Sequence, residues 1–90
     1  MEKNRVENIS KAVLLADSLL FEQSVVENLS TLEDKKAFRE IWTKATLFEN
    51  WNHTDLNIGF KQTVEILTTS FGFNETTANK IANAASYEWK

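Results

Sequence analysis

The chain has 90 residues, 42% hydrophobic and 26% charged, a size and composition that predict one globular domain over residues 1–90 and argue against disorder. It has no cysteine and a single histidine, which excludes disulfides, thiol catalysis and zinc sites built from Cys and His. Ten basic and thirteen acidic residues give a net charge of -3, which argues against a nucleic-acid partner.

Helix is the only regular structure that the sequence pattern favours. Proline is absent and glycine occurs twice, so few residues interrupt a helix. Apolar residues recur at steps of three and four in four segments separated by short polar turns. We therefore expect an all-α fold: a compact bundle of four short helices, or five, with mostly antiparallel neighbours.

The first segment predicts a helix from about Lys3 to about Asn28. Between Ala12 and Phe21 only Asp17 and Ser18 are polar, so this helix would be apolar on more than one face. Its main apolar stripe is Val6, Ile9, Val13, Ala16 and Leu20.

Three apolar residues of this helix lie outside its main stripe, namely Leu14, Phe21 and Val25. Three short partner helices have too little surface to cover such a helix on all sides. We therefore hypothesise that these residues form an interface with a second copy or with another protein. The alternative is a break near residues 22–24, after which each half buries its own face.

The second segment begins near Ser30 and Thr31, where Ser30 and Glu33 match a capping box. The polar stretch from residue 50 to residue 54 predicts a loop. A third helix then begins at Thr54 or Asp55. The apolar stripe of the second segment is Phe38, Ile41, Ala45 and Phe48, with Trp42 beside it, and that of the third is Leu56, Phe60, Val64, Leu67 and Phe71.

The two glycines have different expected effects. Gly59 lies in the first turn of the third helix and weakens its start by up to about 1 kcal/mol relative to alanine. Gly72 is placed to end that helix in the left-handed conformation. Asn74 then caps the fourth helix. The fourth apolar stripe is mainly alanine, so its backbone can approach a partner closely: Ala78, Ile81, Ala82, Ala85 and Trp89.

Four polar-tipped aromatic residues are candidates for a contact surface, because Trp and Tyr are common interface anchors. Trp42 and Trp89 lie on apolar stripes and are expected in the core. Trp51 lies in the polar loop, and Tyr87 points away from the stripe of the fourth helix, so we predict that both face a partner.

Catalytic and metal-binding patterns are missing from the sequence. His53 is the only side chain with an ordinary pKa near neutrality, and its setting in a polar loop favours exposure or helix capping. We find no nucleophile elbow, phosphate-binding loop or metal-ligand spacing, and predict no enzyme, no cofactor and no metal.

These observations predict a non-enzymatic protein-interaction domain, regulatory or inhibitory, that occupies a partner's surface or forms a homodimer. Its predicted contact residues are Leu14, Phe21, Val25, Trp51 and Tyr87. Without a secretory signal or a membrane-spanning run, we expect it in the cytoplasm. One alternative is a helix-turn-helix-like DNA-binding regulator that uses residues 74–90, with Asn79, Lys80 and Asn83 facing outward. Another is a precursor or scaffold peptide.

Overall fold

The computed structural model describes residues 1–52 and 55–89, apart from the side chains of Phe48 and Trp89. The predicted all-α class is confirmed, and five of the helices have seven or more residues. The predictions made for His53, for Thr54 and for the side chains of Phe48 and Trp89 fall outside the described part. The elements are α1 (Lys3–Leu14), α2 (Phe21–Asn28), α3 (Leu32–Ala45), α4 (Phe48–Trp51), α5 (Leu56–Thr69), α6 (Glu75–Ser86) and the 3₁₀ turn η1 (Tyr87–Trp89).

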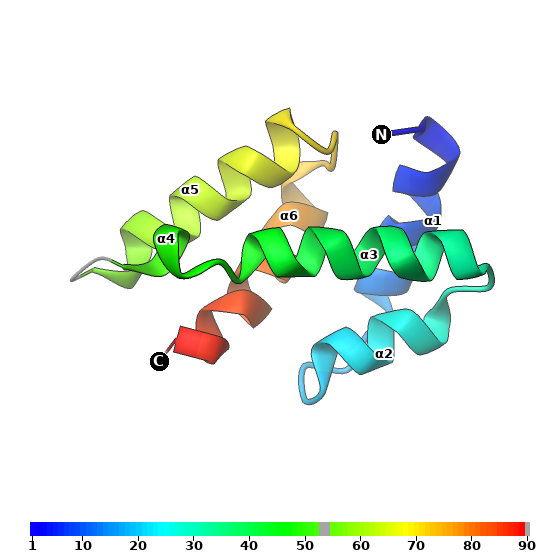
Figure 1. Cartoon of the computed structure of the whole chain (residues 1–90), viewed down its shortest axis with the longest axis horizontal. Coiled ribbons are helices and arrows are strands. Elements are labelled where there is room, and N and C mark those ends of the chain that lie inside the picture. Colours follow the sequence, from blue (N-terminus) through cyan, green and yellow to red (C-terminus); the bar gives the residue numbers. More distant parts are fainter. Residues whose placement is uncertain (53–54, 90) are drawn as a thin grey trace.

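The last long helix, α6, is at the centre of the packing. It contacts α1, α3 and α5, and it runs behind α3 in Figure 1. Its core-facing side chains are mostly small: Ala78, Ala82 and Ala85 are fully buried with Ile81 between them. Because alanine lets helix axes come close, three helices can pack around this one.

Helix caps account for several boundaries. The Asp55 carboxylate accepts a hydrogen bond from the Asn57 N–H at 2.9 Å, and the Asn74 side chain accepts one from the Thr77 N–H at 2.9 Å. Each cap satisfies a backbone donor that has no partner inside its helix. Gly72 has φ of 80°, the left-handed conformation expected after α5. These three predictions are confirmed.

The start of α3 differs by one residue from the prediction. Its N-cap is Thr31 and not Ser30, and the Thr31 hydroxyl accepts from the Asp34 N–H at 3.1 Å. The buried Asp34 carboxylate also accepts from Arg5 Nε and Asn8 Nδ2, each at 3.1 Å. This carboxylate therefore links the start of α3 to the first turns of α1.

The first predicted helix is divided in two. Because α1 ends at Leu14 and α2 begins at Phe21, the prediction of one helix from about Lys3 to about Asn28 is wrong. The alternative of a break, after which each half buries its own face, is right about the division but wrong about its position, since residues 22–24 lie inside α2. The division lets each short helix turn one apolar face to the core, with Ile9, Ala12 and Val13 buried from α1 and Phe21 and Val25 buried from α2.

Two buried threonine hydroxyls, those of Thr63 and Thr77, have no hydrogen-bond partner among the described residues. A buried polar group without a partner costs about 1–3 kcal/mol. We expect Thr63→Val, which keeps the side-chain shape, to raise the free energy of unfolding by about 1 kcal/mol. Urea denaturation measures this change.

Thr68→Val is the matched control on the same helix, because the Thr68 hydroxyl donates to the carbonyl oxygen of Glu65 at 3.2 Å. It should give no such gain. A loss of stability in Thr63→Val would contradict the assignment of an unpaired hydroxyl.

Candidate functional site

The loop between α1 and α2, residues 15–20, presents leucine side chains to solvent. Leu15, Leu19 and Leu20 are 77%, 79% and 75% exposed. Single exposed apolar residues are ordinary, but three leucines in one short loop are a concentration of the kind found at binding sites. We call residues 15–20 the leucine loop.

Local hydrogen bonds shape the leucine loop without glycine or proline. The Leu19 N–H donates to the Asp17 carboxylate at 3.0 Å, which forms a tight turn closed by a side chain. The Asp17 N–H donates to the Ser24 hydroxyl of α2 at 2.9 Å. These bonds replace the helical ones that a continuous helix would have made.

A contact from a distant part of the sequence braces the same loop. Lys80 Nζ, on α6, donates to the carbonyl oxygens of Leu14 at 2.9 Å and Ala16 at 3.2 Å. These carbonyls lie at the C-terminal end of α1, where a positive charge is favourable. Lys80 is the only basic residue of α6, so this contact occupies the lysine that a DNA-recognition helix would use for phosphate.

Leu20 has an unfavourable backbone conformation for its residue type. Its φ of 56° and ψ of 46° are left-handed, a region that costs roughly 1–2 kcal/mol for residues other than glycine. Leu20 also occupies the N-cap of α2, where it makes no side-chain cap hydrogen bond. Asparagine would suit both features better. Local stability thus disfavours this exposed leucine, a pattern that is common at functional sites.

An open hollow of about 800 Å³ lies between the leucine loop, α3 and the C-terminal end of α6. Phe21 and Trp42 line its buried part, with ring centroids 5.3 Å apart. Leu19, Leu20 and Tyr87 line it from the exposed side. In Figure 1 the start of α2 and the chain's C-terminal turn lie below α3 on the same side of the molecule. We call the five residues Leu19, Leu20, Phe21, Trp42 and Tyr87 the docking surface.

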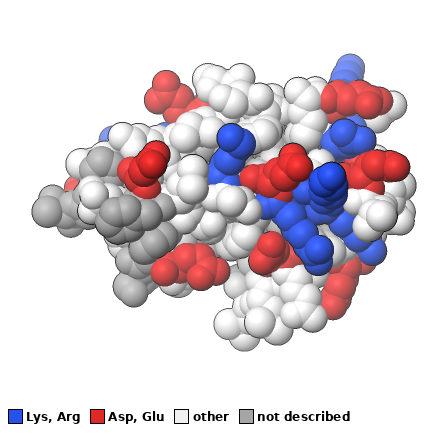
Figure 2. All heavy atoms as spheres, in the orientation of Figure 1, with Lys and Arg blue, Asp and Glu red and all other residues white. Residues whose placement is uncertain are grey.

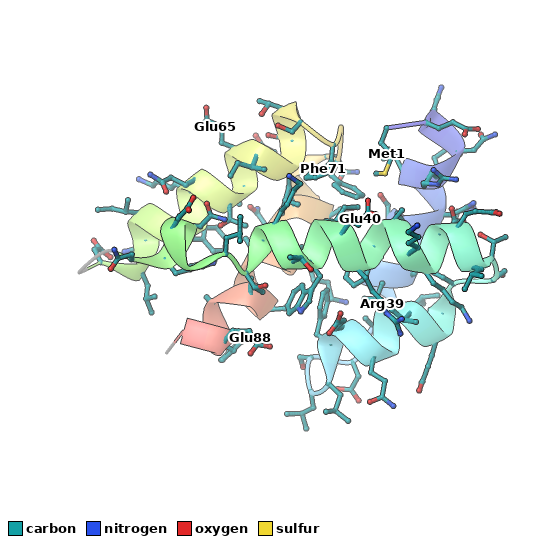
Figure 3. All side chains as sticks on the ribbon, viewed as in Figure 1. Met1, Arg39, Glu40, Glu65, Phe71 and Glu88 are labelled. Carbon is teal, nitrogen blue, oxygen red and sulfur yellow. The ribbon has the colours of Figure 1, made fainter. Side chains whose placement is uncertain are left out.

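The charged side chains that line this hollow all carry the same sign. They are Glu22, in the first turn of α2, and Glu88, in the C-terminal turn, and no described Lys or Arg lines it. Figure 3 shows Glu88 on the C-terminal turn, facing the side on which α2 begins. The hollow therefore has an apolar, aromatic interior with carboxylates at its edge.

The structure separates the five predicted contact residues. Phe21 and Tyr87 both line the hollow, although Phe21 is buried and only 6% exposed. Leu14 is 52% exposed at the end of α1 and lies outside the lining. Val25 and Trp51 are core residues. The exposed contact roles predicted for Val25 and Trp51 are therefore corrected, because folding within one chain already covers these side chains. Phe21 is buried as well, but it keeps a place in the lining of the hollow.

Sequence reasoning missed the exposed leucines that matter most here, Leu19 and Leu20. Helical periodicity placed Leu20 on the buried stripe, because the pattern assumed a helix where the chain forms a loop. The available signal was the apolar run of residues 12–21, which was too apolar for one helix face. The helical pattern attributes the apolar residues beyond one helix face to Leu14, Phe21 and Val25, whereas the structure exposes Leu19 and Leu20 in a loop.

Other kinds of site find no support in the part of the chain that the structure describes. Over residues 1–52 and 55–89, no three metal-ligating side chains cluster. Within the same residues, no helix has the length and apolar character needed to cross a bilayer.

Comparisons with protein-family models, with curated proteins and with solved structures give no match to this chain.

Proposed function

We propose that this protein acts by binding another protein, without chemistry of its own, through the docking surface. The observation that carries the proposal is the exposure of Leu19 and Leu20 on a braced loop beside an aromatic-lined hollow. A braced loop loses little conformational freedom on binding, so more of the contact energy becomes affinity. Its small size suits a regulatory or inhibitory role in which it occupies a surface of a larger protein, and we propose that it does so in the cytoplasm.

Apolar burial supplies part of the energy that such binding needs. Covering an exposed leucine side chain contributes about 1.5–3 kcal/mol. Leu19 and Leu20 together therefore offer about 3–6 kcal/mol before the costs of association. Tyr87, 60% exposed, adds an aromatic anchor with a polar tip.

The test is selection from a random peptide library displayed on phage, followed by calorimetric titration of the selected peptides. We expect peptides that bind the wild type with Kd near about 1 μM. The double variant Leu19→Ser/Leu20→Asn should bind them at least about tenfold more weakly, since two apolar anchors are lost. Asn suits the left-handed cap position, so this variant should fold at least as stably as the wild type.

The matched control is Leu32→Ser/Ile58→Ser, which removes two exposed apolar side chains outside the hollow, 81% and 44% exposed. It should bind the selected peptides like the wild type. The proposal fails if the library yields no binder, or if the leucine-loop variant binds as tightly as the control.

A further inference from the structure

We infer that the docking surface takes an amphipathic helix of another protein, with apolar side chains facing the hollow and Lys or Arg at the helix flanks. This inference rests on the proposed function and adds the shape and charge of the partner. Three features of the described residues support it: the absence of a strand edge, the acidic edge of the hollow, and the poor fit of a second copy.

The bound segment of the partner must form the hydrogen bonds of its own backbone N–H and C=O groups. No strand occurs in the described part of the chain, so an extended peptide finds no sheet edge to pair with. The uncharged polar groups that line the hollow are the side chains of Ser18, Gln23 and Asn83 and the Tyr87 hydroxyl, too few to pair a whole extended backbone. An extended segment would therefore leave N–H and C=O groups without partners against the apolar lining. A helix pairs these groups internally and presents side chains alone.

The negative charge at the edge of the hollow favours a partner helix with Lys or Arg at its flanks. Glu22 and Glu88 line the hollow without any described Lys or Arg. The nearby Arg39 lines a separate hollow together with Glu22 and Glu27. Figure 2 shows basic side chains gathered over α3, with acidic ones among them, and an uncharged bulge where α2 begins. A partner with Lys or Arg beside its apolar anchors would meet carboxylates on docking.

A second copy of this chain fits the docking surface poorly. A symmetric dimer brings the same patch of each subunit together. Glu22 and Glu88 of both copies would then lie in one interface, and the described lining supplies no cation to offset four carboxylates. Like charges brought together at an interface oppose association. The occupant is therefore a different protein.

Two synthetic helical peptides with one shared apolar face test this inference, one flanked by lysines and the other by glutamates. At low salt we expect the lysine peptide to bind about tenfold more tightly than the glutamate peptide, because it can form an ion pair with each of the two edge carboxylates, Glu22 and Glu88. This preference should shrink as salt screens the charges. Circular dichroism should show the lysine peptide gaining helix on binding.

Two double variants that remove charges test whether the preference for the lysine peptide comes from the edge of the hollow. Glu22→Gln/Glu88→Gln should abolish most of the preference for the lysine peptide. Glu33→Gln/Glu40→Gln changes the net charge equally but alters α3, so it should keep the preference. Equal binding of both peptides, the reverse result for the two variants, or a bound peptide without helix would overturn the inference.

The same experiment separates failure of the inference from failure of the proposed function. If both peptides bind equally tightly and Leu19→Ser/Leu20→Asn weakens both, the docking surface stands and the basic partner is wrong. If neither peptide binds and phage selection also yields no binder, the proposed function itself fails. A wild-type dimer in sedimentation equilibrium that Leu19→Ser/Leu20→Asn dissociates would also overturn the inference, by showing a second copy in the hollow.

Discussion

Trp51→Ala is expected to lower the free energy of unfolding by about 3–5 kcal/mol, the usual cost of deleting a buried aromatic side chain. Trp51 is 5% exposed, and its indole N–H donates to the carbonyl oxygen of Ala45 at 2.8 Å. That carbonyl lies at the C-terminal end of α3. The variant thus loses apolar burial and also leaves a buried acceptor without its donor.

Urea denaturation followed by far-UV circular dichroism measures this loss. A domain of this size has roughly 5–13 kcal/mol of stability in total, so the variant should unfold at a much lower urea concentration. Trp51→Phe keeps most of the apolar burial and removes only the N–H, so it should cost less, about 1–2 kcal/mol. A Trp51→Ala variant as stable as the wild type would show that Trp51 is not a core residue.

Gly59→Ala is expected to destabilise the domain by about 2 kcal/mol, although alanine is the better helix former. A Cβ at this position would lie 2.6 Å from the carbonyl oxygen of Asn50 and 2.6 Å from the Trp51 ring. One of these contacts is with backbone, which cannot rotate away. Overpacking typically costs about 1–3 kcal/mol. This cost outweighs the gain in helix propensity, which is at most about 1 kcal/mol.

Asn57→Ala is the matched control for this prediction. Asn57 is exposed in the first turn of the same helix, so alanine raises helix propensity there without a new contact. The control should be as stable as the wild type or slightly more stable. Thermal denaturation of both variants compares them, and a stabilised Gly59→Ala would show that α4 does not pack closely on α5.

Gly59 shows why part of this fold could not be predicted. Sequence reasoning treated it as a weak point at the start of a helix, since that is its local effect. In the fold, its missing side chain admits Trp51 from α4. Burial of Trp51 in a polar stretch depends on this contact and on an acceptor at the end of α3, and neither leaves a periodic pattern in the sequence.

Local signals predicted the all-α class, the two last long helices and several helix ends. They did not predict the division of α1 from α2 or the short helix α4, and the docking surface depends on distant contacts. Caps such as Asn74, and the left-handed Gly72, act within a few residues and can be recognised from sequence. The end of α1 depends on Lys80, which lies 66 residues from the carbonyl oxygen of Leu14 that it contacts. The hollow combines residues of α2, α3 and the C-terminal turn, a juxtaposition that only the tertiary structure supplies.

The most direct measurement of the central claim is an NMR titration of the ¹⁵N-labelled domain with a peptide selected from the library. The account predicts that the largest shifts fall on the leucine loop, on the Trp42 indole N–H and on residues 83–88. It also predicts intermolecular contacts between the peptide's apolar side chains and Leu19 or Leu20. Shifts confined to another face, such as the hollow lined by Phe60 and Val64 of α5 and Asn79 of α6, with the leucine loop unchanged, would contradict it.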